Sequence, residues 1–414
     1  MNIRCRSVAL VLLTSTTTWA ADVKVTSTTI FSGRPDVVDG QVRTVIPMVE
    51  MVGLRVRRID TPVFDDVGVT VDAWGALTVP GAPPAGLSGD VNLVFVEGLT
   101  FKKHLFVRLG RQFVSGGVAR NQYFDGLAAE FRGPAGFGLS AFVGQPVAAR
   151  FANFLKGEVA SGARLFWAPS INAAVGTSFI HTADRSAVLR QDIGADARWS
   201  PVRSVTLNGA ITWSIADKRL AELDVGARWA PLEDLDFGLQ FRRSAPDLFL
   251  ARNSIFTVFA DSSRDDLGAS ATYQMTRSLS FYGDGRALWI NGELGYELGL
   301  RAAAKSYTHP KTVAHVQLRR LSVPSSGLTH GRIGGRHVLP VGVGLSLDFE
   351  TYLLDKAVRG KAHSFSVSTT ASWELDRLWL VGVTAFAGST PFYDSRLELM
   401  AKLTYTFDHA GGAP

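Results

Sequence analysis

Cysteine and long apolar runs are both nearly absent from this sequence. Its 414 residues include a single cysteine, Cys5. Although 46% of the residues are hydrophobic and only 19% are charged, no segment after Leu13 approaches the roughly 20 consecutive apolar residues of a membrane helix. The apolar residues must therefore be dispersed along the chain, and no membrane-spanning helix is predicted.

The first 20 residues have the layout of a secretory signal peptide. Arg4 and Arg6 precede the apolar run 8–13, and small residues stand last and third-last before a cut after Ala20. The alternative is a membrane anchor, but this run is far too short to cross a bilayer as a helix. Removal of residues 1–20 also removes Cys5, so the exported chain would have no disulfide, thiolate nucleophile or Cys-ligated metal.

The positive charge of the chain is dispersed. A net charge of +6 and a pI near 9.5 would suit nucleic-acid binding in a cytosolic protein. An exported chain rarely meets that partner, and the charges are scattered singly rather than clustered. We therefore expect no nucleic-acid partner.

From residue 23 onward, segments of about ten residues alternate between apolar and small or polar side chains, as strands with one wet face do. Residues 205–215, 235–242, 341–350 and 364–375 show the pattern. A soluble β-sandwich or propeller would alternate in the same way. Only 80–90 and 323–340 resemble linkers, so one continuous array over residues 21–407 is predicted.

A repeated tryptophan favours a membrane barrel over the soluble alternatives. Three strand segments end their series of alternate apolar residues with a tryptophan just before a proline, at Trp167, Trp199 and Trp229. The three lie roughly thirty residues apart, which is the length of two strands with their connections. Indole rings prefer the membrane interface, and aromatic girdles mark transmembrane barrels. A tryptophan corner in a soluble repeat is the alternative. We predict these three residues, together with Phe407, at the membrane interface.

Residues 397–407 resemble the C-terminal strand of outer-membrane proteins, an amphipathic strand that ends in an aromatic residue, here Phe407. The resemblance implies a location in the outer membrane of a Gram-negative bacterium, in contact with its lipid. It also implies that the barrel-assembly machinery binds this strand. Residues 408–414 depart from the pattern, and we expect them to form a short periplasmic tail.

Strands that face lipid cannot leave backbone groups unpaired, so the sheet must close. With both termini in the periplasm the strand number must be even. We predict an all-β fold, a transmembrane antiparallel up-and-down β-barrel of about 22 strands, within roughly 18 to 24. Residues 327–339 are its least certain strand. Too few residues separate Ala20 from the first strand for a plug domain. The short periplasmic turns are expected near Pro134, Pro169, Pro201, Pro231, Arg277, Pro310 and Asp376.

The alternate residues that form the polar side of each predicted strand include charges of both signs, and we expect these charges in the lumen. Opposed charges there favour hydrated solutes and rings of like charge select ions by sign, although the same residues would also pair across strands in any wet barrel. Small inward residues such as Gly194 and Gly226 indicate an open lumen. The predicted pore-lining residues are Arg108, Arg164, Arg190, Arg198, Arg228, Arg242, Arg286, Arg301, Asp192, Asp196, Asp224 and Glu297.

A Gly-Arg-Gln motif at 110–112, followed by Arg120 and by Asp-Gly at 125–126, resembles a strand-and-loop motif of alginate-export-type porins and other large substrate-selective barrels. The resemblance covers about twenty residues. It implies that Arg108, Arg111 and Arg120 lie at the channel and contact an anionic solute. Strand alternation would place the Arg111 side chain on the face toward lipid unless a bulge intervenes.

Motifs of common enzyme and cofactor sites are missing. The eight histidines form no His-x-x-x-His pair, and no Gly-x-Ser-x-Gly or Cys-x-x-Cys-His occurs. We expect no metal, no cofactor, no catalytic residue and no enzyme. Outer-membrane phospholipases and proteases with Ser/His or Asp/His pairs at the barrel rim are the alternative, because a spacing search would miss them.

Two functional hypotheses follow. The first is a porin-like channel for passive passage of small hydrophilic solutes, with a preference for anions. The second is a barrel that sheathes a periplasmic or lumenal protein partner, as in porin-cytochrome conduits. No residue of the sequence separates them.

Overall fold

The structure of the protein is a computed structural model. It describes residues 21–38, 41–59, 61–78, 87–120, 122–147, 158–185, 187–248, 263–309, 311–323 and 326–410. The predicted signal peptide, residues 1–20, lies outside the described residues.

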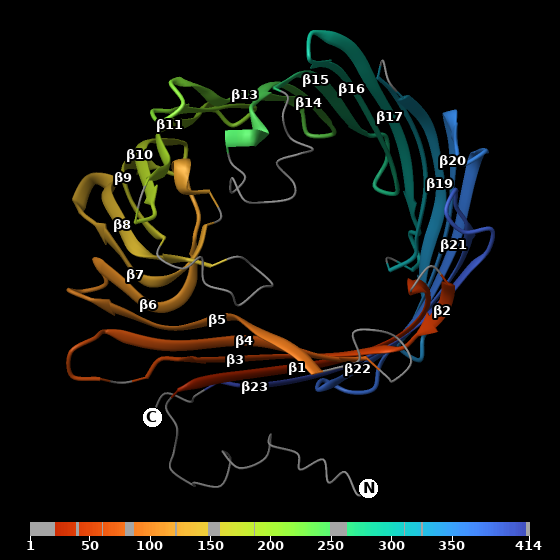
Figure 1. The fold of residues 1–414 in the computed structure, drawn as a ribbon, viewed down its shortest axis with the longest axis horizontal. Coiled ribbons are helices and arrows are strands. Elements are labelled where there is room, and N and C mark those ends of the chain that lie inside the picture. Colours follow the sequence, from red (N-terminus) through yellow and green to blue (C-terminus); the bar gives the residue numbers. More distant parts are fainter. Residues whose placement is uncertain are drawn as a thin grey trace, which may run out of the picture.

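A single antiparallel sheet closes on itself to form the barrel in Figure 1. The wall begins with β1 (Asp22–Val38), β2 (Gln41–Val45), β3 (Pro47–Arg57), β4 (Asp66–Thr78), β5 (Leu87–Thr100), β6 (Leu105–Val114), β7 (Gln122–Arg132) and β8 (Phe137–Pro146). It continues with β9 (Val159–Ser170), β10 (Ala173–Ala183), β11 (Val188–Val202), β12 (Val205–Ser214), β13 (Arg219–Leu232), β14 (Leu235–Ser244), β15 (Arg264–Gln274) and β16 (Leu279–Ile290). It ends with β17 (Glu293–Lys305), β18 (Val313–Val323), β19 (Ser326–Val338), β20 (Val343–Val358), β21 (Lys361–Glu374), β22 (Trp379–Ser389) and β23 (Arg396–His409).

The barrel closes where β1 pairs with β23, over the register from Val23↔His409 to Gly33↔Leu399. The short β2 pairs with the far end of β1 and continues the β1–β3 hairpin, so the closed wall has 22 strands. The predicted antiparallel barrel of about 22 strands is confirmed. The least certain strand, 327–339, is β19, which pairs with β18 and β20 along its length.

Three short 3-10 helices interrupt the described connections: η2 (Gly117–Ala119), η3 (Pro134–Gly136) and η4 (Pro246–Leu248). No helix in the described part of the chain is long and apolar enough to cross a membrane. We call the end of the barrel where β1 begins and β23 ends the proximal end. The opposite end, which carries η2 and η4, is the distal end.

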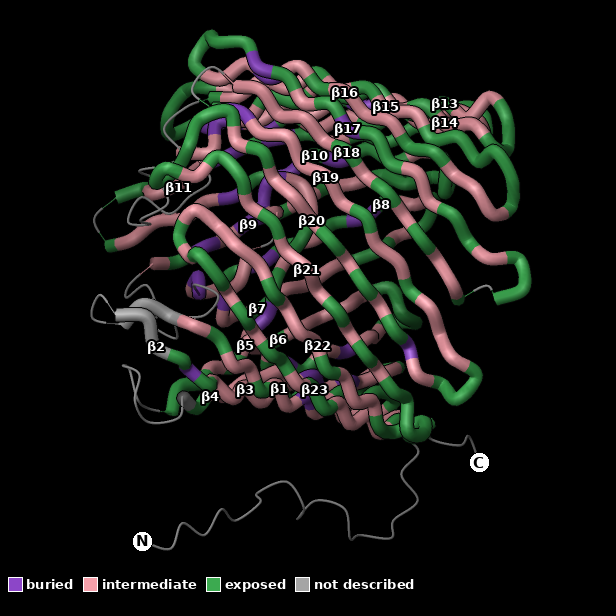
Figure 2. The backbone as a smooth tube through the Cα atoms, turned by 90° about the vertical axis from the view of Figure 1, so that its right-hand side faces the viewer, coloured by how far each residue is buried: buried purple, intermediate pink, exposed green. Residues whose placement is uncertain are grey.

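Alternation places apolar side chains on the outside of the barrel. In β12, Leu207, Ile211 and Trp213 are exposed, whereas Thr212 and Ser214 between and beyond them are buried. Figure 2 shows this change from residue to residue along the oblique strands. A face that exposes leucine, isoleucine and tryptophan is stable against lipid rather than water. We call it the outer wall, and the opposite face the inner wall.

The prolines of the tryptophan repeat lie within strands rather than in turns. The two-residue turns are 171–172, 203–204 and 233–234, and each follows a shift in the pairing register. Pro201 and Pro231 fall inside the shifts Trp199/Val202 and Trp229/Leu232. Proline cannot donate a ladder hydrogen bond and is accommodated at such bulges. The expected turns therefore come two residues later than the prolines.

The three tryptophans stand exposed beside these proximal turns. Trp167 stacks on Phe137 and Trp229 on Phe237, each with ring centroids 5.7 Å apart, and the Trp167 indole N–H donates to the Ala135 carbonyl at 3.1 Å. All three are on the outer wall. Their place at the membrane interface, and that of Phe407, stays a prediction.

The stacking contact between Trp229 and Phe237 allows a test of how these aromatic residues stabilise the barrel. We expect Trp229→Ala to destabilise the folded barrel more than Trp199→Ala by about 1 kcal/mol, because only the former also loses an aromatic pair. Urea unfolding in lipid vesicles measures the difference, and Phe237→Ala should remove it. Equal losses at both positions would contradict the contribution of the stack.

Candidate functional site

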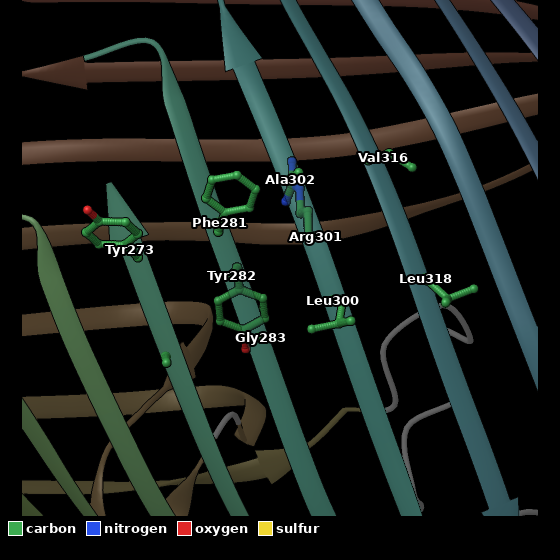
Figure 3. Close-up of a pocket in the computed structure, with 10 residues that line it drawn as sticks. Tyr273, Phe281, Tyr282, Gly283, Leu300, Arg301, Ala302, Val316 and Leu318 are labelled. Carbon is green, nitrogen blue, oxygen red and sulfur yellow. The ribbon is translucent and has the colours of Figure 1, made fainter. Parts of the chain in front are cut away.

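A groove of about 380 Å³ lies on the outer wall, where Figure 3 shows its lining on neighbouring strands. Tyr273, Phe281, Leu300, Val316 and Leu318 surround it and are exposed. Small residues at its floor leave the space open. Because the groove offers almost no polar group and faces lipid, it does not suit a hydrophilic solute.

A second hollow, of about 320 Å³, lies on the inner wall over β12–β16. Glycines form its floor, and a Cβ atom added at Gly238 would come within 2.6 Å of the Ser270 hydroxyl, so a larger side chain would fill it. We call this space the inner hollow. Its polar lining consists of Asn208, Arg228, Gln240, Ser270, Tyr282, Asp284 and Arg286.

Neighbouring carboxylates hold two of these side chains in place. Arg228 binds Asp236 at 2.5 Å, and the Gln240 amide donates to both oxygens of Asp224 at 3.1 Å. Arg286 is exposed and has no ion pair within the described ranges. The inner hollow therefore offers guanidinium, amide, hydroxyl and carboxylate groups to a solute in a space with a glycine floor.

An inward loop, residues 115–120, enters the lumen between β6 and β7. Figure 1 shows η2 inside the ring of strands, beside β9 to β11. Val118 and Ala119 are almost completely buried and pack against an apolar cluster. The cluster consists of Phe124, Phe142, Ala160 and Ile180. Burial of this loop against the inner wall narrows the lumen on that side.

Hydrogen bonds with two strands of the inner wall, β10 and β11, fix the inward loop. The Val118 N–H donates to the Ser178 hydroxyl at 2.9 Å, and Arg190 donates to the Val118 carbonyl at 2.8 Å. Arg190 is itself held by Asp192, whose side chain is 1% exposed, at 2.6 Å. Gly117 adopts a φ of +53°, and a Cβ there would lie 2.2 Å from the Ser178 oxygen. No other residue fits at position 117 without displacing the loop.

Arg120 anchors the end of the inward loop through an ion pair with Glu222 of β13. Glu222 also binds Arg242 of β14 at 3.0 Å. Burial lowers the pKa of the Arg120 guanidinium, and the Glu222 carboxylate opposes that shift. Arginine nevertheless keeps its proton at physiological pH, so Arg120 keeps the positive charge with which it anchors the loop.

The Gly-Arg-Gln motif lies in the distal half of β6, the strand from which the inward loop departs. β5 pairs with β6 only as far as Val94↔Arg111, whereas β6 continues to Val114 along β7. Where β5 and β6 separate, Arg111 binds Asp125 at 2.9 Å, Asp90 at 3.3 Å and the Val91 carbonyl at 2.9 Å. Its side chain is 11% exposed. These contacts favour a structural role for Arg111 rather than contact with solute.

The neighbouring motif residues pack closely against β5 and β7. Gly110 has a φ of +127°, and a Cβ there would lie 2.2 Å from the Val94 carbonyl oxygen. The Gln112 side chain, 0% exposed, donates to the Arg108 and Gly126 carbonyls at 3.1 and 3.0 Å. Gly110 thus permits the close approach of β5, and Gln112 satisfies one backbone carbonyl in β6 and one in β7.

The other predicted lining residues divide into paired and unpaired groups. Arg108 binds Glu97 at 2.8 Å with its guanidinium 4.4 Å from the Phe95 ring. Arg164 binds Asp196 at 2.6 Å. Arg198 and Arg301 are exposed and, like Arg286, have no ion pair in the part of the chain that the structure describes.

Sequence reasoning missed the arginines on the inner wall of β18 and β19. Arg319 binds Glu297 at 2.9 Å, and Arg332 binds Asp348 at 2.7 Å and Glu350 at 3.4 Å. Arg319 lies opposite Gly299 in the ladder. This position cannot be inferred from the sequence without knowing the strand register. Among the described residues, no three His, Asp or Glu side chains gather as a metal site.

Comparison with known proteins finds no matching family model and no matching curated protein. The chain is similar to the translocation pore of the P pilus usher PapC, with 8% identity over 93% of this chain and 99% of that chain, at a TM-score of 0.54. It is also similar to Pseudomonas aeruginosa OpdK with vanillate, with 10% identity over 94% and 99% of the chains, at a TM-score of 0.45. Pseudomonas aeruginosa OccD3 (OpdP) gives 9% identity over 94% and 91%, at 0.45.

At these identities the likeness shows the fold, which is that of an outer-membrane β-barrel. A closed 22-strand barrel with an apolar outer wall belongs in the outer membrane. The similar structures do not bear on the resemblance to alginate-export-type porins, which stays a prediction.

Proposed function

We propose that this barrel is an outer-membrane channel for passive passage of small hydrophilic solutes, with a weak preference for anions. The observation that carries the proposal is the imbalance between paired and unpaired charges on the inner wall. This imbalance affects which solutes cross, because the lumen is the route across the bilayer that a barrel offers.

Three of the four acidic lining residues form ion pairs with arginines. Asp192 and Asp196 bind Arg190 and Arg164, and Glu297 binds Arg319. Asp224 accepts hydrogen bonds from the neutral Gln240 amide and keeps its charge, so one carboxylate stands against three arginines without an ion pair among the described residues. Arg198, Arg286 and Arg301 remain exposed with no ion pair in the described ranges. The field in the lumen is therefore expected to be positive, which favours anionic solutes.

The inner hollow gives such a solute a resting place. Arg286 and Arg228 can bind a carboxylate, and Asn208, Gln240 and Tyr282 can bind hydroxyl groups. Its floor is bare backbone, so a hydrated sugar-sized molecule can lie against the wall. We infer that small anionic or polyhydroxylated solutes pause here during passage.

The alternative function, a sheath around a partner protein, needs a lumen clear of the barrel's own chain. The inward loop is fixed to the inner wall by Val118, Arg120 and their partners, and it reduces that space. This observation favours a solute channel. The longest candidate for a second occluding loop, residues 247–261, lies outside the described residues except for its first two.

Purified barrel in planar bilayers tests the proposal. We expect large, voltage-insensitive currents without any partner and a reversal potential that indicates weak anion preference. Replacing Arg198, Arg286 and Arg301 together by glutamine should abolish that preference. A barrel that conducts only after a partner protein is stripped from it would support the sheath, and one that never conducts would contradict both functions.

Substitution of one arginine that has an ion-pair partner should change ion selectivity less than the triple substitution. We expect Arg108→Ala to shift the preference toward cations, because it leaves the Glu97 carboxylate without its partner. Glu97→Gln is the matched control and should shift it toward anions. Each shift should stay below about twofold in permeability ratio at 0.1 M salt, where the Debye length is about 10 Å. Shifts in the same direction would contradict a role for this pair in selectivity.

A further inference from the structure

The apolar groove of Figure 3 lies in the part of the outer wall nearer the proximal end. Tyr273 is the second-last residue of β15 and Phe281 the third of β16, whereas Leu300 and Leu318 are each the sixth residue from the proximal ends of β17 and β18. With a rise of about 3.3 Å per residue in strands tilted by about 40°, the groove reaches about 15 Å from the proximal ends. That distance is half of the roughly 30 Å hydrocarbon core. The groove, which we call the outer groove, therefore spans one lipid leaflet.

Small residues of β17 and β18 extend the floor of the outer groove to the proximal end. Figure 3 shows Phe281 on one side and Val316 on the other, and Ala302 lies between them in the ladder. One step nearer the proximal end, Ala304 of β17 lies opposite Ala314 of β18 on the same face. A narrow apolar channel thus opens where the strands end, and its shape suits an acyl chain.

The connections at the open end of this channel carry basic side chains. Arg277 lies between β15 and β16, Lys305 ends β17, and Lys311 lies between β17 and β18. All three are exposed, and none forms an ion pair with another described residue. The Lys305 N–H donates to the Ser278 carbonyl at 2.7 Å, which holds the two connections together. We call Arg277, Lys305 and Lys311 the basic rim.

Acidic residues are missing from most of the chain around the basic rim. Residues 298–347 include seven arginines and lysines and no aspartate or glutamate. Hydrogen bonds with Thr276 and Ser278 lower the pKa of the Tyr307 phenol, and the nearby charge of Arg277 lowers it further. Arg277 therefore lies beside the connection that carries Lys311. The turn on the other side of β15, at 233–234, is acidic, so the positive charge is centred on β16 to β18.

We propose that the outer groove and the basic rim together bind a phospholipid with an anionic headgroup. An acyl chain fills the apolar channel, and the basic rim binds the headgroup phosphate at the level where the strands end. A soluble anion has no contact with the groove, and a lipid without net charge gains little from the rim. Only an anionic lipid uses both features. The site lies outside the lumen, so it is independent of the proposed passage of solutes.

Native mass spectrometry of the delipidated barrel tests the basic rim. We expect the wild type to bind phosphatidylglycerol more tightly than phosphatidylethanolamine of the same chain length, by about fivefold or more. Arg277→Gln, Lys305→Gln and Lys311→Gln should each weaken phosphatidylglycerol binding by about fivefold, and the triple variant should bind both lipids equally. Arg203→Gln, exposed in the turn between β11 and β12, is the matched control and should bind as the wild type does. Equal affinity of the wild type for both lipids, or an equal loss in the control, would overturn the proposal.

Filling the outer groove is an independent test, because it leaves the charges in place. We expect Ala302→Phe to weaken binding of phosphatidylglycerol with long chains and to leave binding of its dihexanoyl analogue unchanged. Gly283→Leu fills the same space, since a Cβ atom there makes an ordinary contact of 3.5 Å with the Leu300 side chain. Val225→Phe, on the outer wall of β13, is the control for added bulk. Heat-modifiable migration shows that each variant has folded.

Two results of the groove experiment would overturn the proposal. The first is long-chain phosphatidylglycerol that binds both groove variants as tightly as the wild type. The second is displacement of that lipid by inorganic phosphate at the same concentration. Either result would show that the basic rim binds an anion without any contribution from the outer groove.

Discussion

Deletion of residues 397–407 is expected to abolish assembly of the barrel in the membrane. This segment is most of β23, which pairs with β22 on one side and closes the sheet against β1 on the other. Without it, β1 and β22 become open edges in lipid. Each unpaired backbone group there costs several kcal/mol, so the loss far exceeds the usual stability of a folded protein.

Truncation of residues 408–414 is the control for this deletion. β23 runs two residues past Phe407, to His409, and Asp408 forms an exposed ion pair with Lys24 at 3.8 Å. Such a pair contributes at most about 1 kcal/mol. We expect the shorter truncation to assemble, as measured by resistance to protease and by heat-modifiable migration in outer-membrane fractions. If both truncations fail equally, the closing strand is misassigned.

Strand alternation predicts the barrel because lipid outside and water inside impose opposite chemistry on neighbouring residues. The rule holds in β12 and, apart from Met400, in β23, where one set of alternate residues is apolar or small and the other is mostly polar. Closure then follows from the cost of an open edge in lipid. The turns predicted near Pro169, Pro201 and Pro231 lie two residues beyond the prolines, because bulges accommodate the prolines within the strands.

The inward loop and the outward direction of Glu50 in β3 could not be predicted in this way. Residues 115–120 carry no periodic pattern, and the partners of Arg120 and Val118 lie 102 and 60 residues away in the chain. In β3, Met48, Val49, Met51 and Val52 are apolar on both parities. The outward direction of Glu50 therefore emerges only from the register with β1 and β23.

The inward loop gives the second large expected effect. We expect Arg120→Ala to raise the mean conductance and to add closures on the microsecond to millisecond timescale of loop motion. The loop loses its anchor to Glu222, although the hydrogen bonds of Val118 remain. Loss of a partner from a half-buried charge pair costs about 1–3 kcal/mol, enough to let the end of the loop detach part of the time.

Arg242→Ala is the matched control, because Arg242 binds the same carboxylate from the wall and does not hold the loop. It should change ion selectivity and leave the current steady. Glu222→Gln removes the charge that both arginines share, so it should combine the two effects. Single-channel recording separates noise from selectivity in one experiment. Equal noise in Arg120→Ala and Arg242→Ala would show that the Glu222 charge itself, rather than the loop anchor, controls the current.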